Sequence, residues 1–216
     1  HGPSSPQASK WAKEDNRTAE ELQTVMVDFM TAIAKRFNTI PNIKWMDVVN
    51  ETVLPNGKWF GPKKGTSLWE NPWLKMGLDP NGFPNYILKS FEIATMHATN
   101  IKLVYNHNAG MQPIMWDKVK ETILYIRSKG HRVDAIGWQG HINLSSSTKD
   151  FIEDTDNTLN KLSELVDWAH ANDLEFHITE LDYKIKDKSN IIVQYQLQAL
   201  LYSKIISLLE SKTATG

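Results

Sequence analysis

The 216-residue sequence contains no cysteine, so it forms no disulfide framework and performs no thiolate chemistry. No stretch approaches the roughly 18 apolar residues that a membrane span needs. The formal net charge of −1 gives no electrostatic reason to expect a nucleic-acid partner. The seven histidines show no H-E-x-x-H or similar spacing, so we expect no metal and no other cofactor. What remains is a single domain, residues 1–216, long enough for a sizeable core.

Apolar patterning and helix-end signals predict that strands and helices alternate along the chain. The first helix opens at a capping box, Thr18 to Glu21, and must end before Pro41. Predicted strands cover 43–50, 101–106, 133–141 and 174–180, and the later predicted helices cover 84–98, 113–129, 156–171 and 190–210. This order is typical of a parallel sheet with helices outside it.

Polar side chains stand where each predicted strand ends. They are Asn50 and Glu51, then Asn106, then Gln139 and His141, and finally Glu180. Taken singly, a Glu after a strand is more often solvated or next to a helix cap, and the Gln-Gly-His run could be a satisfied polar cluster. Because the carboxyl ends of parallel strands meet at one edge, their occurrence in order predicts a shared site. Two carboxyls at one site suit the hydrolysis of a glycosidic bond.

A long connection, residues 52–83, is rich in glycine and proline and carries Trp59, Trp69 and Trp73. Loops of this length are usually functional or disordered. The tryptophans favour an ordered, packed loop. The functional alternative is that this loop lies over a binding cleft. Of the eight tryptophans in the chain, we expect about half to serve packing alone.

Three segments together resemble one known family. Trp45–Glu51 resembles the W-D-V-V-N-E segment of glycoside hydrolase family 10, the endo-β-1,4-xylanases. Ile136–His141 is similar to that family's I-G-x-Q-x-H strand, and Ile178–Asp182 to its I-T-E-L-D strand. The resemblance implies a (β/α)8 TIM barrel, secretion, and xylan or a xylo-oligosaccharide as the substrate.

The resemblance also implies roles for individual residues. Glu51 would be the acid/base and Glu180 the nucleophile of a retaining mechanism, with carboxyls roughly 5–5.5 Å apart. Asp182 and His177 would support the nucleophile without contacting the substrate. The substrate-binding residues would be Asn50 at the sugar 2-hydroxyl, His141, Gln139, Asn106, His1 and Trp11.

The sequence departs from the family in two ways. The N-D-Y-N segment reads Asn106-His107-Asn108-Ala109, so the aromatic that stacks on the leaving-group side is absent. Only strands 4 to 7 of the barrel are present, with His1 at the end of the third. We therefore expect an unclosed sheet of order 4-5-6-7, helices on its outer face, and an apolar inner face around Val48, Val104, Ile136 and Ile178. Such a chain would be poorly stable, or completed by further segments of the same precursor.

Three functions stay open at this point. The first is a retaining endo-xylanase, and the second a retaining β-glucanase or mixed xylan and glucan hydrolase of the same barrel type. The third is an inactive, binding-only fragment in which the glutamates survive but the cleft does not.

Overall fold

The computed structural model describes residues 16–61, 71–143, 147–185 and 190–212. The N-terminal half contains α2 (Ala19–Asn38), β1 (Trp45–Asn50), the 3-10 helix η1 (Pro72–Met76), α3 (Asn85–His97) and β2 (Lys102–His107). The C-terminal half contains α4 (Pro113–Ser128), β3 (Ala135–Trp138), β4 (His141–Ile142), α5 (Asp150–Glu153), α6 (Thr155–Ala171), β5 (Glu175–Ile178), β6 (Asp182–Tyr183) and α7 (Ile191–Glu210). Within these ranges no helix is both long enough and apolar enough to cross a membrane.

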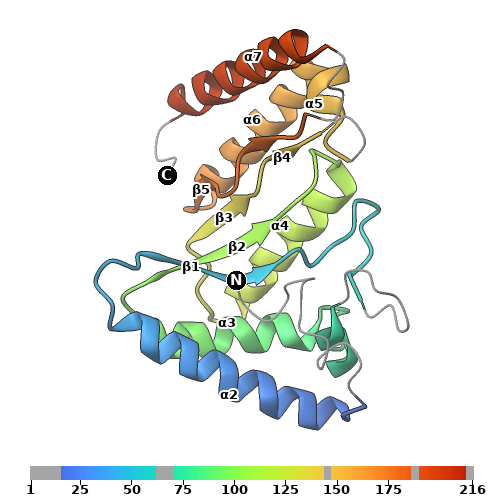
Figure 1. The fold of residues 1–216 in the computed structure, drawn as a ribbon. Helices are drawn as coiled ribbons and strands as arrows, with labels where there is room; N and C mark the ends of the chain where they lie inside the picture. The colour runs from blue at the N-terminus through green and yellow to red at the C-terminus, as the bar shows by residue number, and fades with distance from the viewer. Residues whose placement is uncertain (1–15, 62–70, 144–146, 186–189, 213–216) are drawn as a thin grey trace.

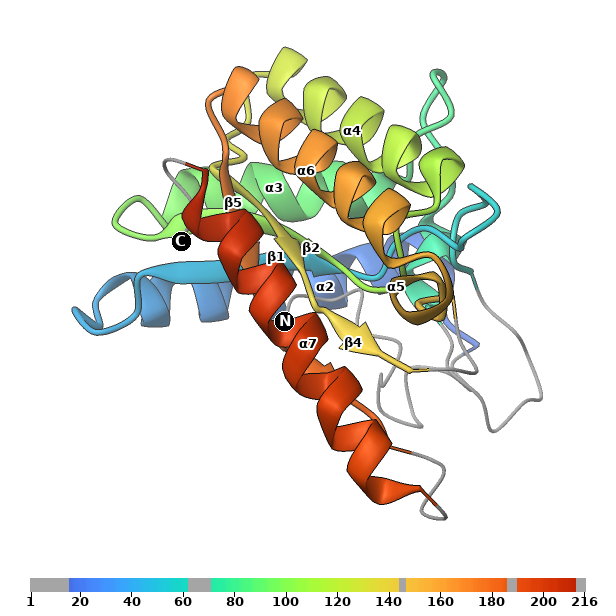
Figure 2. The same cartoon turned by 90° about the horizontal axis from the view of Figure 1, so that it is seen from above.

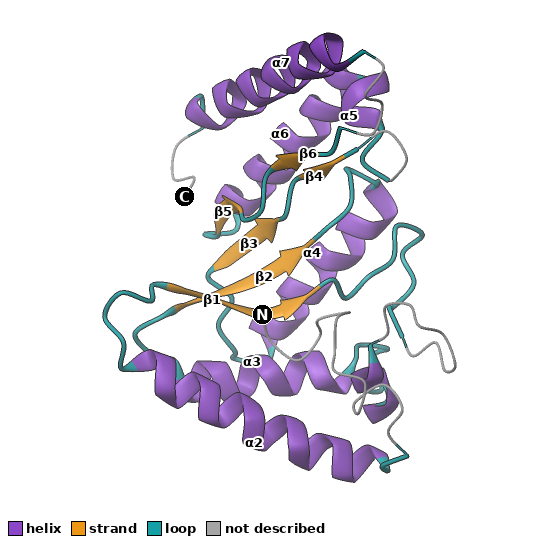
Figure 3. Cartoon of the chain, in the orientation of Figure 1, coloured by secondary structure: helices purple, strands orange, loops and turns teal. Residues whose placement is uncertain are grey.

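Four strands form one parallel sheet in the order β1-β2-β3-β5 (Figure 1). This confirms the predicted order of strands 4 to 7, half the strand count of a (β/α)8 barrel. A second pair, β4 with β6, runs parallel beyond the ends of β3 and β5 (Figure 3). The sequence did not predict this pair, because two-residue strands leave no periodic pattern.

The helix ends follow the predicted chemistry. Thr18 Oγ1 accepts a hydrogen bond from the Glu21 N–H at 3.2 Å, and Glu21 Oε2 accepts from the Thr18 N–H at 2.8 Å. After α4 the chain turns at Gly130, whose φ of +82° favours glycine. The N–H groups of Gly130 and His131 bond back to the carbonyls of Arg127 and Ile126, a Schellman ending.

The apolar core lies between the sheet and the helices α3, α4 and α6, which stand on one side of the strands (Figure 2). Tyr105 of β2 stacks on Phe91 of α3, and Trp138 of β3 stacks on Phe151 of α5. Register pairs Tyr105 with Ile136, which therefore also faces the helices. The odd-numbered residues of β2 and the even-numbered residues of β3 thus build the core.

The inner face of the sheet carries a polar network. Of the residues predicted to line it, Ile136 and Ile178 face the helices instead, whereas Val104 lies on the inner face beside Ala135. Glu175 of β5 forms an ion pair with Lys102 of β2. Its Oε2 also accepts from Trp45 Nε1 at 3.0 Å and contacts His177 Nε2 at 3.0 Å. Register explains the error, because Ile136 faces the helices while its neighbours Ala135 and Gly137 turn inward.

The exposed large apolar side chains of the helices are concentrated instead on α7. On α2, Phe29 is 48% exposed, because burial follows the row Leu22, Met26, Met30 and Ala34. In α7 only Gln194, Leu201 and Ile205 are buried. The exposed large apolar residues of α7 are Ile192, Val193, Tyr195, Leu200 and Ile206.

We expect the purified chain to bind a fluorescent dye that reports apolar surface, mainly through α7. The double variant Ile192→Lys, Leu200→Lys should lower the dye signal by about half, because it removes two of the exposed apolar side chains of α7. Ile114→Lys, an exposed isolated isoleucine on α4, is the matched control and should leave the signal nearly unchanged. If the double variant gives the same dye signal as the unaltered chain, the apolar surface that binds the dye lies elsewhere.

Candidate active site

Backbone hydrogen bonds align the polar residues that follow the four strands. The Glu51 N–H donates to the Asn106 carbonyl at 3.2 Å, and the Gln139 N–H donates to the His107 carbonyl at 2.9 Å. The Glu180 N–H then donates to the Gln139 carbonyl at 3.0 Å. The parallel ladder therefore continues past the strand ends and sets both glutamates in one row at the carboxyl edge of the sheet.

Gln139 lies at the centre of this row. Its Nε2 donates to Glu51 Oε1 at 2.7 Å and to Asn50 Oδ1 at 3.0 Å. Gln139 and Asn50 are each only 2% exposed, whereas Glu51 is partly exposed. Gln139 thus contacts the Glu51 carboxyl through its side chain and the Glu180 backbone N–H through its carbonyl, so both predicted glutamates are bonded to one residue.

His141 holds the other carboxyl. Its Nε2 lies 3.1 Å from Glu180 Oε2, and its Nδ1 lies 2.8 Å from Asp182 Oδ2. Between Gln139 and His141 stands Gly140, whose φ of +76° turns the chain so that successive polar side chains serve different glutamates. The pairing of β4 with β6 sets His141 directly opposite Asp182.

Glu51 has a left-handed backbone, with a φ of +53°. This conformation costs a non-glycine residue on the order of 1–3 kcal/mol and persists only where the surroundings hold it. Such strain gathers at functional sites, so it marks Glu51 independently of its sequence motif.

Two predicted site residues lie away from the carboxyls. Asn106 is fully buried, with Nδ2 3.4 Å from Asp47 Oδ2 and Oδ1 accepting from Thr179 Oγ1 at 3.1 Å. It lies inside β2, which extends one residue further than predicted, and its contact with substrate stays a prediction. His177 contacts Glu175 rather than Glu180, because strand alternation keeps it on the inner face below the edge.

Of the other residues singled out from the sequence, two tryptophans are packed and three residues lie outside the described ranges. Trp59 donates from Nε1 to the Gly82 carbonyl at 3.0 Å and lies under Lys118, and Trp73 is 6% exposed. Both tryptophans are therefore packed against the rest of the protein, which agrees with the prediction of an ordered, packed loop. His1, Trp11 and Trp69 lie outside the described residues.

His107 is a site residue whose part the sequence did not reveal. It is fully buried, and its Nε2 accepts a hydrogen bond from the Val53 N–H at 3.1 Å. Burial lowers the pKa of His107 from 6.5 to about 4. The only available signal was the histidine in place of the family's aspartate at this position.

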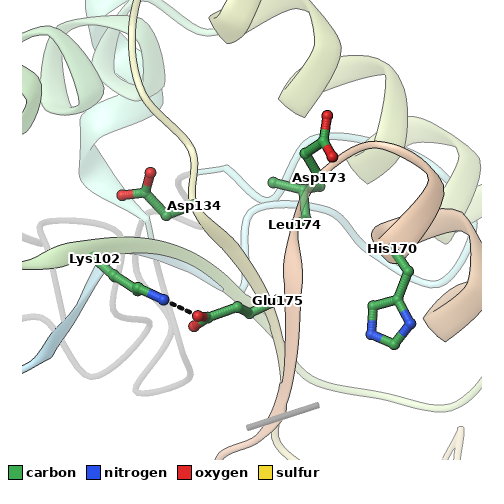
Figure 4. A pocket seen from close by; sticks show the side chains of 6 residues that line it. All are labelled: Lys102, Asp134, His170, Asp173, Leu174 and Glu175. Carbon is green, nitrogen blue, oxygen red and sulfur yellow. Dashed lines mark hydrogen bonds and ion pairs between the residues drawn. The ribbon is translucent and has the colours of Figure 1, made fainter. Parts of the chain in front are cut away.

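A cavity of about 350 Å³ lies at the opposite edge of the sheet (Figure 4). Its lining comprises Lys102, Asp134, His170, Asp173, Leu174 and Glu175. These residues lie near the amino-terminal ends of β2 and β5, so the cavity is separate from the row that holds the two glutamates. Among the described residues, no group of three or more His, Asp or Glu side chains is arranged to hold a metal ion.

The buried histidine predicts how stability depends on pH. The folded state keeps His107 neutral down to about pH 4, whereas the unfolded chain takes up a proton near pH 6.5. Stability from this residue is therefore present above pH 6.5 and lost as the pH falls, by roughly 2–3 kcal/mol between pH 7 and pH 4.5. Urea unfolding should show a smaller loss for His107→Gln, which does not titrate. Equal losses in both proteins would contradict the assignment.

Comparison with known proteins places the chain in a family. The family model described as "Glycosyl hydrolase family 10" matches residues 4–215. The chain is 31% identical over 220 residues to endo-1,4-beta-xylanase A of Thermoanaerobacterium saccharolyticum, a match that covers 97% of this chain and 16% of that protein. It is 30% identical over 203 residues to exoglucanase XynX of Acetivibrio thermocellus, covering 91% of this chain and 15% of that protein.

Solved structures agree on the fold. Xylanase 10B of Thermotoga maritima superposes with a TM-score of 0.73 at 25% identity, over 100% of this chain and 59% of that one. Xylanase 10B of Thermotoga petrophila, solved with xylobiose, gives a TM-score of 0.75 at 22% identity, over 100% of this chain and 58% of that one. The chain thus spans under two thirds of the length of these relatives. With the barrel strands, the two glutamates and the family match in agreement, the chain belongs to glycosyl hydrolase family 10.

Proposed function

We propose that the chain carries the catalytic centre of a retaining endo-β-1,4-xylanase, within one catalytic domain. The observation that supports this best is the arrangement around Gln139, with Glu51 bound to its amide and Glu180 bound to its backbone. Two carboxyls held at one sheet edge, each by a different polar partner, are what a double displacement at a sugar carbon requires.

The two carboxyls take different parts in the reaction. Glu180 attacks the anomeric carbon while Glu51 gives its proton to the departing glycosidic oxygen, so a glycosyl ester forms and the leaving chain departs neutral. Glu51, now a carboxylate, takes a proton from water, which attacks the ester and releases Glu180.

The supporting residues follow from the contacts. His141, held by Asp182, orients the Glu180 carboxylate for attack. Gln139 and Asn50 orient Glu51. We also assign Asn50 to the 2-hydroxyl of the sugar. At 2% exposure, this contact requires the side chains over Asn50 to move when substrate binds.

Xylan is the proposed substrate because the relatives are xylanases by name and one neighbouring structure holds xylobiose. A polysaccharide of this size does not cross a cell membrane, so we place the reaction outside the cell. A β-glucan is the second candidate, since one relative that is 30% identical is an exoglucanase.

The roles of the two glutamates can be tested with substrates that differ only in the leaving group. We expect Glu180→Ala to abolish turnover of every substrate, because no glycosyl ester forms. Glu51→Ala should lower kcat/KM for xylotetraose at least about 10²-fold but largely spare a dinitrophenyl β-xylobioside, whose leaving group needs no proton. Steady-state kinetics on both substrates decides. An equal loss on both for Glu51→Ala would exclude the assigned roles.

Substrate class is tested by reducing-sugar release. The chain should release sugar from xylan and not from cellulose if the proposal holds. Release from β-glucan or from both polymers would favour the second candidate. No turnover together with retained binding of xylo-oligosaccharides, measured by calorimetry, would instead indicate a binding-only protein.

A further inference from the structure

The loop that follows β1 is bonded, residue by residue, to β2. Residues 51–53 make three consecutive contacts with residues 105–107. The first is the backbone bond of Glu51 already described. In the second, the Thr52 and Tyr105 hydroxyls lie 2.5 Å apart, and both side chains are fully buried. The third joins the Val53 N–H to the imidazole of His107.

The His107 ring is fixed in the state that this third contact needs. Its Nδ1 lies 3.1 Å from the Asn108 carbonyl and so carries the proton, which leaves Nε2 as an acceptor. The edge of the ring packs against Trp116 of α4, with centroids 5.7 Å apart. Val53 is 3% exposed, so without His107 its N–H would be a buried donor with a large desolvation cost.

His107 contacts both segments that position Glu51, the loop after β1 and the segment that contains Gln139. Through its imidazole it binds the chain two residues after Glu51, and through its carbonyl it binds the N–H of Gln139. Gln139 in turn donates to the Glu51 carboxyl. A shift of this one ring would therefore move the Glu51 backbone relative to the amide that orients its carboxyl.

We propose that His107 is a positioning residue for Glu51: by accepting the Val53 N–H, it holds the left-handed backbone that directs the Glu51 carboxyl to Gln139. This inference rests on the proposed role of Glu51 as the acid/base. On this inference, the buried His107 side chain controls proton delivery by Glu51 without touching the substrate.

A matched pair of substitutions tests the acceptor itself. The Asn side chain ends near the place of Nδ1, whereas the Gln side chain reaches the place of Nε2 and can still accept from Val53. We expect His107→Asn to lower kcat/KM for xylotetraose at least about tenfold, with the dinitrophenyl β-xylobioside changed less than about threefold. His107→Gln should retain both activities within about threefold.

Tyr86→Phe is the control for general loosening of the core. It removes a buried hydroxyl that accepts from Asn71 Nδ2 at 2.9 Å and leaves the Val53–His107 hydrogen bond in place. It should show no loss that depends on the leaving group. Amide hydrogen exchange gives a readout independent of activity, with the Val53 amide exchanging faster in His107→Asn and at the native rate in His107→Gln.

Each outcome has a defined consequence. Equal losses on both substrates for His107→Asn, a Gln variant as impaired as the Asn variant, or the same selective loss in Tyr86→Phe would overturn the positioning role. These results leave the proposed function intact, provided that Glu51→Ala shows its own dependence on the leaving group. If the native chain turns over neither substrate, or Glu51→Ala shows no such dependence, the proposed function fails and this inference fails with it.

Discussion

The register of the parallel sheet is the constraint on which the site depends. Because the ladder continues beyond the strand ends, the backbone groups of Glu51, Gln139 and Glu180 are placed by hydrogen bonds rather than by loop packing. A slip of one residue would turn every side chain to the other face of the sheet. The same register that buries Tyr105 and Ile136 against the helices therefore also aligns the two carboxyls.

Around this row, the two carboxyls have separate supports. Glu51 depends on Gln139 and on the loop anchored to β2, where its left-handed backbone is held in place. Glu180 depends on His141, which the short pairing of β4 with β6 sets between two carboxyl groups. Each support lies on a different element, so the fold gives each glutamate its own surroundings, and the proposed division of roles rests on that difference.

Much of the fold could be predicted from the sequence because it rests on local signals. The capping box and the apolar periodicities placed the four strands of the main sheet and the five long helices to within a few residues, and the strand-end motifs placed both glutamates at one edge of the sheet. Part of the inner face was predicted wrongly because Ile136 in a short strand can face either way until its partners are known. The position of Asn106 inside β2 was missed for a similar reason, since whether a residue lies inside or after a strand is decided by pairing.

By itself, the sequence determined the order of the elements, the parallel sheet and the two carboxyls at its carboxyl edge. Only the tertiary structure decided what holds those carboxyls. The contacts of Val53 with His107 and of Gln139 with Glu51 join residues 54 and 88 positions apart. No local pattern encodes such contacts, because burial and hydrogen bonding at these positions exist only once separate strands have been brought side by side.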